Sequence, residues 1–138
     1  MKFIDDYLKL MICVIKADDV IHKGEEELFL NMLKDLGISS SAQNKYNKLL
    51  FSTKSADIAG ITSRVAKNVN RSMMPWLVCG AFLMADADGK ILEEEIQVIK
   101  QLLEKSGFSP KQFTKVKQWG LEYVKHTKKG IKLFSEKP

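Results

Sequence analysis

Carboxylates gather in two short segments of this chain, and their number and spacing could bind a cation. Ten of the 17 acidic residues lie within residues 18–27 and 86–95. Oxygen atoms that converge from a turn and from the start of the next helix are the donors that calcium and magnesium prefer. The side chains that could contribute are those of Asp18, Asp19, Glu25, Asp86, Asp88 and Glu95. The sequence therefore predicts a weak site for a divalent cation (calcium, magnesium or zinc) shared by the two segments.

The two acidic segments belong to a repeated unit. Residues 8–39 align without a gap with residues 78–109, and seven of the 32 aligned pairs are identical. Ordinary residue frequencies would give roughly two identical pairs. The identical pairs are Ala17/Ala87, Asp18/Asp88, Ile21/Ile91, Glu25/Glu95, Leu33/Leu103, Gly37/Gly107 and Ser39/Ser109. The alignment predicts two copies of a helix–acidic loop–helix unit.

The second acidic loop matches only half of a calcium-binding EF-hand. Asp88, Gly89, Ile91 and Glu95 reproduce the second half of that motif, Asp-Gly-x-Ile-x-x-x-Glu. Counting back to the first position of the motif gives Met84, whose thioether cannot supply the hard oxygen that calcium needs there. The loops are therefore predicted not to be tight calcium sensors.

Two other interpretations of the acids stay open beside cation binding. Carboxylates near a helix N-terminus are favoured by the helix dipole, and Glu25 and Glu95 stand where a capping-box glutamate would stand. Three residues before them, His22 and Leu92 are poor N-caps, so such a box would be incomplete. The loops could also recognise a protein partner. Purely structural loops, cation binding and partner recognition all remain compatible with the sequence.

Helical periodicity runs through the chain and should position these loops. Apolar residues recur at helical spacing in seven segments, at about residues 3–17, 28–36, 40–51, 55–69, 75–87, 96–106 and 110–130. Gly37 and Gly107 are expected to end helices, and Gly130 is expected to end the last one. Gly89 predicts a positive φ angle, which Asp19 can also adopt. The fifth segment is apolar nearly all round and is expected to be the central buried helix.

Length and composition predict a single all-α domain, a compact bundle of about seven helices. The chain has 138 residues, of which 45% are hydrophobic and 28% charged, as in ordinary globular proteins. No sustained alternation of apolar and polar residues predicts a strand. Within one domain over residues 1–138, we expect repeat one at 8–39, connecting helices at 40–73, repeat two at 76–109, and a basic helix and tail at 110–138.

Several features predict a cytoplasmic location. Asp5 and Asp6 interrupt what would be the basic start of a signal peptide. The longest apolar run, residues 76–85, has ten residues, about half of what a membrane span needs. Cys13 and Cys79 lie in apolar segments without metal or redox spacing, which is typical of buried thiols in a reducing compartment.

Positive charge is concentrated at the end of the chain. Residues 1–110 hold 14 basic and 15 acidic residues, whereas residues 111–138 hold eight lysines and two glutamates. These lysines could follow phosphates or contact an anionic membrane surface. Nucleic-acid binding is disfavoured, because this segment has no arginine and no recognised motif. Lysines that simply keep a packed helix solvated are the alternative.

No motif indicates an enzyme. The two histidines, His22 and His126, are interpreted as a loop residue and a solvated residue near the tail rather than as a base and a ligand. The chain has no nucleophile elbow, no phosphate-binding glycine loop and no zinc-ligand spacing. The sequence therefore predicts a protein without catalytic activity.

The doubled motif resembles that of the TerB-like family of tellurite-resistance proteins, which includes an N-terminal domain of DnaJ-type co-chaperones. The resemblance covers about residues 8–125. The matching residues are Asp88, Gly89, Ile91 and Glu95 in one loop and Asp18, Ile21 and Glu25 in the other, where Asp19 replaces the usual glycine. The resemblance implies a bundle of about seven helices, a bacterial stress-response role without enzymatic activity, and an acidic cluster associated with metal binding.

These inferences together predict an interaction module of the tellurite-resistance type. Its paired acidic loops are expected to bind a divalent cation or a protein partner. The alternative is a module that binds an anionic surface, nucleic acid or a peripheral membrane contact, through its lysine-rich last helix.

Overall fold

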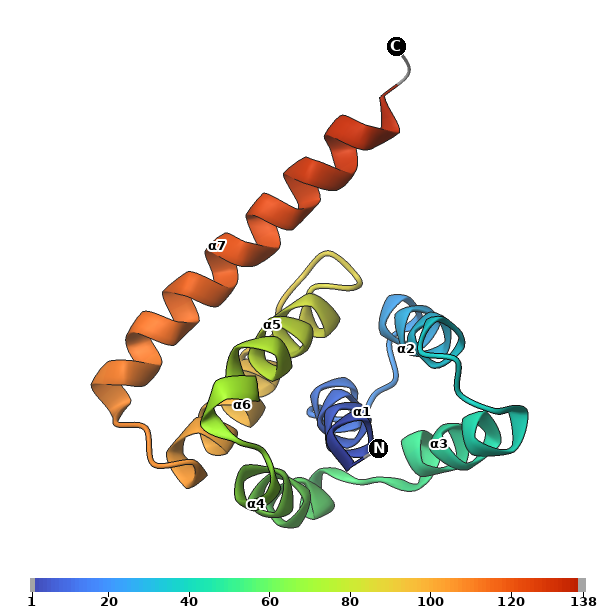
Figure 1. Cartoon of the computed structure of the whole chain (residues 1–138), viewed down its shortest axis with the longest axis horizontal. Coiled ribbons are helices and arrows are strands. Elements are labelled where there is room, and N and C mark those ends of the chain that lie inside the picture. The colour runs from blue at the N-terminus through green and yellow to red at the C-terminus, as the bar shows by residue number, and fades with distance from the viewer. Residues whose placement is uncertain (1, 137–138) are drawn as a thin grey trace.

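The computed structural model describes residues 2–136, and within that part of the chain it contains helices and no strands. Figure 1 shows the helices as one bundle. The α-helices are α1 (Lys2–Ile15), α2 (Lys23–Asp35), α3 (Ser40–Ser52), α4 (Ile58–Asn68), α5 (Met74–Ala85), α6 (Glu93–Lys105) and α7 (Pro110–Ser135). Two short 3-10 helices, η1 (Ser55–Asp57) and η2 (Arg71–Met73), precede α4 and α5. The predicted all-α architecture of seven helices is confirmed.

The central helix of the bundle is α1, not α5. Helix α1 packs against α2, α3, α4, α5 and α6, and every residue from Leu10 to Ile15 is fully buried. Helix α5 supplies much of the core as well, but Trp76 on this helix is 69% exposed. The expectation that the fifth helix is largely buried is confirmed. It packs against α1, α2, α6 and α7, but the helix that the others surround is α1.

Glycine ends the second helix of each repeat, as predicted. Gly37 and Gly107 have φ angles of 68° and 91°, a left-handed conformation that glycine adopts without steric cost. The residue after each glycine returns its N–H to a carbonyl near the helix end, Ile38 to Leu33 at 3.2 Å and Phe108 to Leu103 at 2.9 Å. These bonds close α2 and α6 and turn the chain into the next helix.

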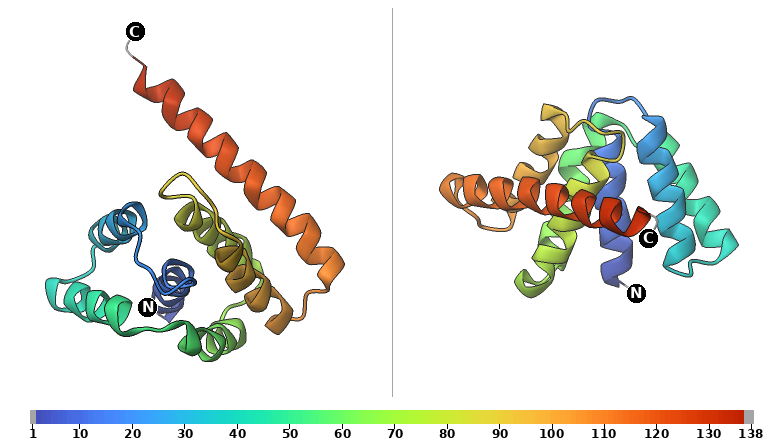
Figure 2. Two further views of the ribbon diagram at one scale, coloured as in Figure 1. Left: turned by 180° about the vertical axis from the view of Figure 1, so that it is seen from behind. Right: turned by 90° about the horizontal axis from the view of Figure 1, so that it is seen from above.

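The last helix is longer than predicted. Helix α7 begins with Pro110 after a Ser109 cap, as its sequence indicates, but it runs through Gly130 to Ser135. The expectation that Gly130 ends it is wrong, because glycine only weakens a helix interior by about 1 kcal/mol. The second half of α7 extends past the other helices (Figure 2). No helix in the described residues is long and apolar enough to cross a membrane.

Candidate functional site

The two acidic loops have the same backbone conformation. Asp19 and Gly89, at equivalent positions, have φ angles of 61° and 88°, which confirms the predicted turn. One residue earlier, Asp18 accepts a hydrogen bond from the N–H of Val20 at 3.1 Å, and Asp88 accepts a longer one from Lys90 at 3.5 Å. Each aspartate thus uses Oδ1 to hold its own loop, and its Oδ2 is the oxygen that lies nearer His22.

A glycine brings the start of α2 against the second loop. A Cβ atom on Gly24 would lie 2.8 Å from the carbonyl oxygen of Ala87 and 3.0 Å from the Cα of Asp88. Backbone atoms cannot move aside cheaply, so any larger residue would push the two segments apart. Two acidic loops that are seventy residues apart in the sequence therefore come together in space.

His22 lies between the aspartates of the two loops. Its Nε2 is 2.9 Å from Asp18 Oδ2, and its Nδ1 is 3.8 Å from Asp88 Oδ2. The pKa of His22 is raised above its ordinary value, mainly by the hydrogen bond to Asp18 and further by the charges of Asp88 and Glu95. When the ring is neutral, donation of Nε2–H to Asp18 leaves the Nδ1 lone pair facing the second loop.

Equivalent glutamates of the two repeats have different surroundings. Glu95 accepts a hydrogen bond from the N–H of Leu92 at 2.7 Å, which is one half of a capping box. Glu25 is fully buried, and neither of its carboxylate oxygens accepts an N–H among the described residues; its neighbour is the Glu95 carboxyl. Helix capping therefore explains Glu95 but leaves Glu25 unexplained, since a buried polar group without a partner is costly.

Burial and neighbouring carboxylates keep Glu25 protonated at neutral pH. Burial raises the pKa of Glu25 to about 10, and the adjacent Glu95, Asp88 and Asp18 act in the same direction. Burial also raises the pKa of Glu95. When no cation is bound, the Glu25 and Glu95 carboxyls can share a proton. A cation at this place would replace that proton.

The six acids predicted to bind a cation fall into two groups. Asp18, Glu25, Asp88 and Glu95 converge around His22. Asp19 instead accepts hydrogen bonds from the N–H and the hydroxyl of Ser55, at 2.8 and 2.6 Å, and these bonds lower its pKa.

Asp86, the sixth predicted ligand, also lies outside the cluster. It pairs with Lys128 of α7 at 2.7 Å. Asp19 and Asp86 therefore tie the loops to neighbouring parts of the fold.

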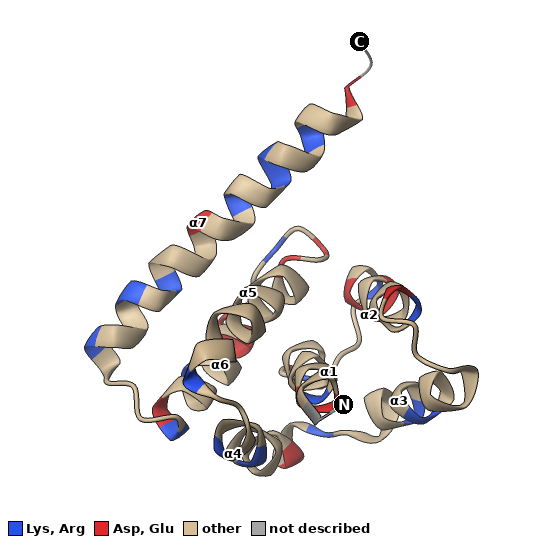
Figure 3. Ribbon diagram, in the orientation of Figure 1, with Lys and Arg blue, Asp and Glu red and all other residues tan. Residues whose placement is uncertain are grey.

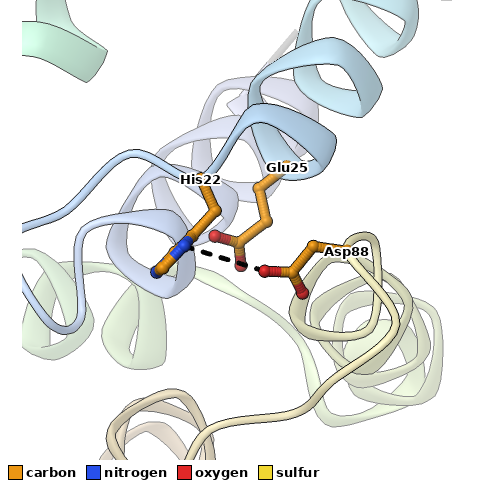
Figure 4. Close-up of side chains that lie close together, drawn as sticks. All are labelled: His22, Glu25 and Asp88. Carbon is orange, nitrogen blue, oxygen red and sulfur yellow. Dashed lines mark ion pairs between the residues drawn. The ribbon is translucent and has the colours of Figure 1, made fainter.

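Three residues of the cluster are placed to share one cation. One ligand atom from each of His22, Glu25 and Asp88 lies within 4.8 Å of the other two. Their side chains point toward one another from α2, its preceding loop and the second acidic loop (Figure 4). Asp18 would then not bind the cation itself but would orient the His22 ring, as carboxylates do for metal-binding histidines. One imidazole with carboxylates suits zinc or manganese better than calcium.

The histidine is the member of the cluster that the sequence interpretation passed over. His22 occupies the position of Leu92 in the other repeat, so the internal alignment gave no reason to single it out. Its spacing could have revealed it. His22 lies four residues after Asp18 and three before Glu25, and these spacings place three metal-binding side-chain types within one loop and one helical turn.

Comparison with known proteins identifies the family. The model of the family described as "Tellurite resistance protein TerB" matches residues 5–118. This range includes both acidic loops, most of α1, all of α2 to α6, and about the first third of α7. No curated protein and no solved structure matches the chain. The chain belongs to the TerB family of tellurite resistance proteins.

Proposed function

We propose that this protein is a binding module whose two acidic loops together hold a divalent cation. The ligands in this proposal are His22, Glu25 and Asp88, with Asp18 orienting the histidine and Glu95 adding negative charge beside them. The observation that carries the proposal is the Glu25 carboxyl, which is fully buried, accepts no N–H among the described residues, and is directed at the other two ligands. A cation would replace the proton that this carboxyl shares with Glu95 and would balance its negative charge.

The composition of the site favours zinc and manganese over calcium and magnesium. A neutral imidazole nitrogen is a good ligand for zinc, and carboxylates accept zinc and manganese as well as harder ions. Calcium prefers six to eight oxygen ligands, and this cluster offers fewer carboxylates once Glu95 is engaged with Leu92. We therefore expect zinc and manganese to bind more tightly than calcium and magnesium.

Bound cation would also change what the loops present to a partner. Without it, the site is a concentration of carboxylates that repel one another, with a proton held between two glutamates. With it, α2 and the second loop would be joined by ligand bonds, and the net charge of the surface around them would rise. A module of the tellurite-resistance type could use this change to recognise a protein partner only in the metal-loaded state.

The test is an amide NMR titration of chelator-stripped protein with zinc, manganese, calcium and magnesium in separate experiments. Saturable shifts, or paramagnetic broadening with manganese, should be confined to residues 18–27 and 86–95. Glu25→Gln should abolish them, and Glu27→Gln should not, because Glu27 lies on the same helix but is exposed. If no cation perturbs these residues at millimolar concentration, the proposal is wrong and the carboxyls are a proton-sharing structural pair.

A further inference from the structure

The end of α7 combines exposed apolar side chains with a high density of positive charge. We define the α7 tip as residues 125–135. Ile131, Leu133 and Phe134 at this tip are 64%, 58% and 94% exposed. Lys125, Lys128, Lys129 and Lys132 lie among them, and no acidic residue occurs between Glu122 and Glu136. Figure 3 shows the lysines along this helix.

The apolar stripe that fixes α7 to the bundle continues into this tip. Phe113, Gly120 and Val124 are the buried residues of α7, and Gly120 lets the helix lie close against Phe82 of α5. Ile131 follows Val124 by seven residues, about two helical turns, so it lies on the same face. After Val124, however, no residue of α7 within the described part of the chain is buried.

The tip therefore extends beyond the surface that covers the rest of the stripe. Helix α7 has 26 residues, which corresponds to a length of about 39 Å, and its second half extends past the other helices in two views (Figures 1 and 2). Among the described residues, the one ion pair that this tip makes joins Lys128 to Asp86. The remaining three lysines are exposed.

The lysines and the exposed apolar side chains of the tip together favour one of three possible binding partners: a second copy of the chain, a nucleic acid or a lipid surface. A second copy of the chain that paired through α7 would bring a second set of lysines close to the first and be repelled. A nucleic acid would satisfy the lysines but would leave Ile131 and Phe134 in water. An anionic lipid surface satisfies both, because its headgroups attract lysines and its hydrocarbon boundary accepts apolar side chains.

We propose that the α7 tip binds the surface of membranes that contain anionic lipids, with Ile131 and Phe134 inserted at the headgroup boundary and Lys129 and Lys132 on the headgroups. The tip touches the second acidic segment through the Lys128–Asp86 ion pair but contains none of the proposed cation ligands, so the proposal does not depend on cation binding. It assigns the basic end of the chain a role that the bundle itself does not require, since the tip contributes no buried residue.

Vesicle sedimentation of the full chain tests this proposal. In the presence of a chelator, the protein should bind vesicles of phosphatidylcholine with phosphatidylglycerol and should not bind phosphatidylcholine alone. Phe134→Ser should lower the partition coefficient roughly tenfold. Lys129→Gln and Lys132→Gln should each lower it about fivefold and make it less sensitive to salt. Phe51→Ser is the matched control, because Phe51 is 57% exposed on α3, away from α7, and it should bind like the unmodified protein.

Insertion can be measured separately from electrostatic attraction. Tryptophan fluorescence of a Phe134→Trp variant should be quenched by vesicles with brominated acyl chains more than the fluorescence of the unmodified protein. Three results would overturn the proposal: no binding to the anionic vesicles, a loss of binding in Phe51→Ser as large as in Phe134→Ser, or no added quenching in Phe134→Trp.

Two alternative occupants of the α7 tip would give different results. Binding to duplex DNA that is tighter than binding to vesicles and unchanged in Phe134→Ser indicates a nucleic acid, and a dimer in sedimentation velocity that Phe134→Ser dissociates indicates a second copy.

Discussion

The buried Glu25 carboxyl should make the cation-free protein less stable at neutral pH, and Glu25→Gln should recover that stability. An unfolded chain releases the proton of this carboxyl near its ordinary pKa of 4.5, whereas burial raises the folded pKa to about 10. Between these values the folded state holds a proton that the unfolded state has lost. Its stability therefore falls as the pH rises, by about 1.4 kcal/mol for each pH unit well above 4.5.

The loss of stability depends only on the pKa of Glu25 in the unfolded chain, provided that Glu25 in the folded protein stays protonated at the pH of the experiment. At pH 7 the contribution is about 3 kcal/mol, and at pH 5 it is below about 1 kcal/mol. Glutamine has the shape of a protonated glutamate and does not ionise. Its amide can also donate a hydrogen bond to the Glu95 carboxylate, as the shared proton does. The variant should thus gain most stability at pH 7 and little at pH 5.

Urea unfolding followed by far-UV circular dichroism, in the presence of a chelator, measures this difference. The free energy of unfolding should be compared for Glu25→Gln, Glu27→Gln and the unmodified protein at both pH values. Glu27 is exposed on the same helix, so its replacement should change stability by no more than about 0.5 kcal/mol. A Glu25→Gln protein that is no more stable at pH 7, or whose gain does not depend on pH, would refute the argument that Glu25 is buried as an acid.

Addition of cation should reverse the advantage of the variant. A ligand that binds only the folded state stabilises it by about 2.7 kcal/mol at one hundred times its dissociation constant. The unmodified protein should gain this stability, and Glu25→Gln should not, because it lacks the ligand. The same substitution is then stabilising without cation and neutral or unfavourable with it, which is a signature of a binding site and not of a structural pair.

Two further predictions concern the orientation of the histidine and the attachment of α7. Asp18→Asn should lower the affinity for zinc roughly 10- to 100-fold, measured by titration calorimetry, because His22 loses the carboxylate that fixes its ring; equal affinities would exclude this role for Asp18. Gly120→Ala should lower the free energy of unfolding by about 1–3 kcal/mol, since its Cβ would lie 2.3 Å from the ring of the fully buried Phe82. Gly130→Ala on the same helix has no atom within 4 Å of the new Cβ and should gain up to about 1 kcal/mol in thermal unfolding; a similar loss in both would contradict the packing argument.

Local features of the sequence predicted the backbone of the site correctly. The positive φ angles at Asp19 and Gly89 and the helix ends at Gly37 and Gly107 depend on the residue itself and on a few neighbours. The doubled unit was visible because both copies keep the same turn and the same apolar spacing. Interactions of this short range are what a single sequence can express.

Which of the six predicted acids lie outside the cluster could not be predicted, because this depends on partners that are distant in the sequence. Asp19 and Asp86 look equivalent to the other acids, but each is held by a residue outside its own repeat, Ser55 and Lys128. The approach of the two loops depends on Gly24, whose importance appears only when the backbone of residues 87–88 is placed against it. The alignment of the two repeats also gave no indication of His22, because it pairs His22 with Leu92 and contains no information on which residues are in contact.

The two glutamates give the strongest internal argument for a site. They occupy the same position of the repeat, and the fold needs only a cap there, as Glu95 shows by accepting the N–H of Leu92 at 2.7 Å. Glu25 makes no such bond, although it is as deeply buried. A glutamine would fill the same space and would not have to take up a proton to be buried. The stability of the bundle therefore gives no reason for a carboxyl at this position. The Glu25 carboxyl weakens the cation-free fold, and it lies next to the His22 imidazole, which Asp18 already orients. Both features are explained if the functional state of the protein contains a bound cation.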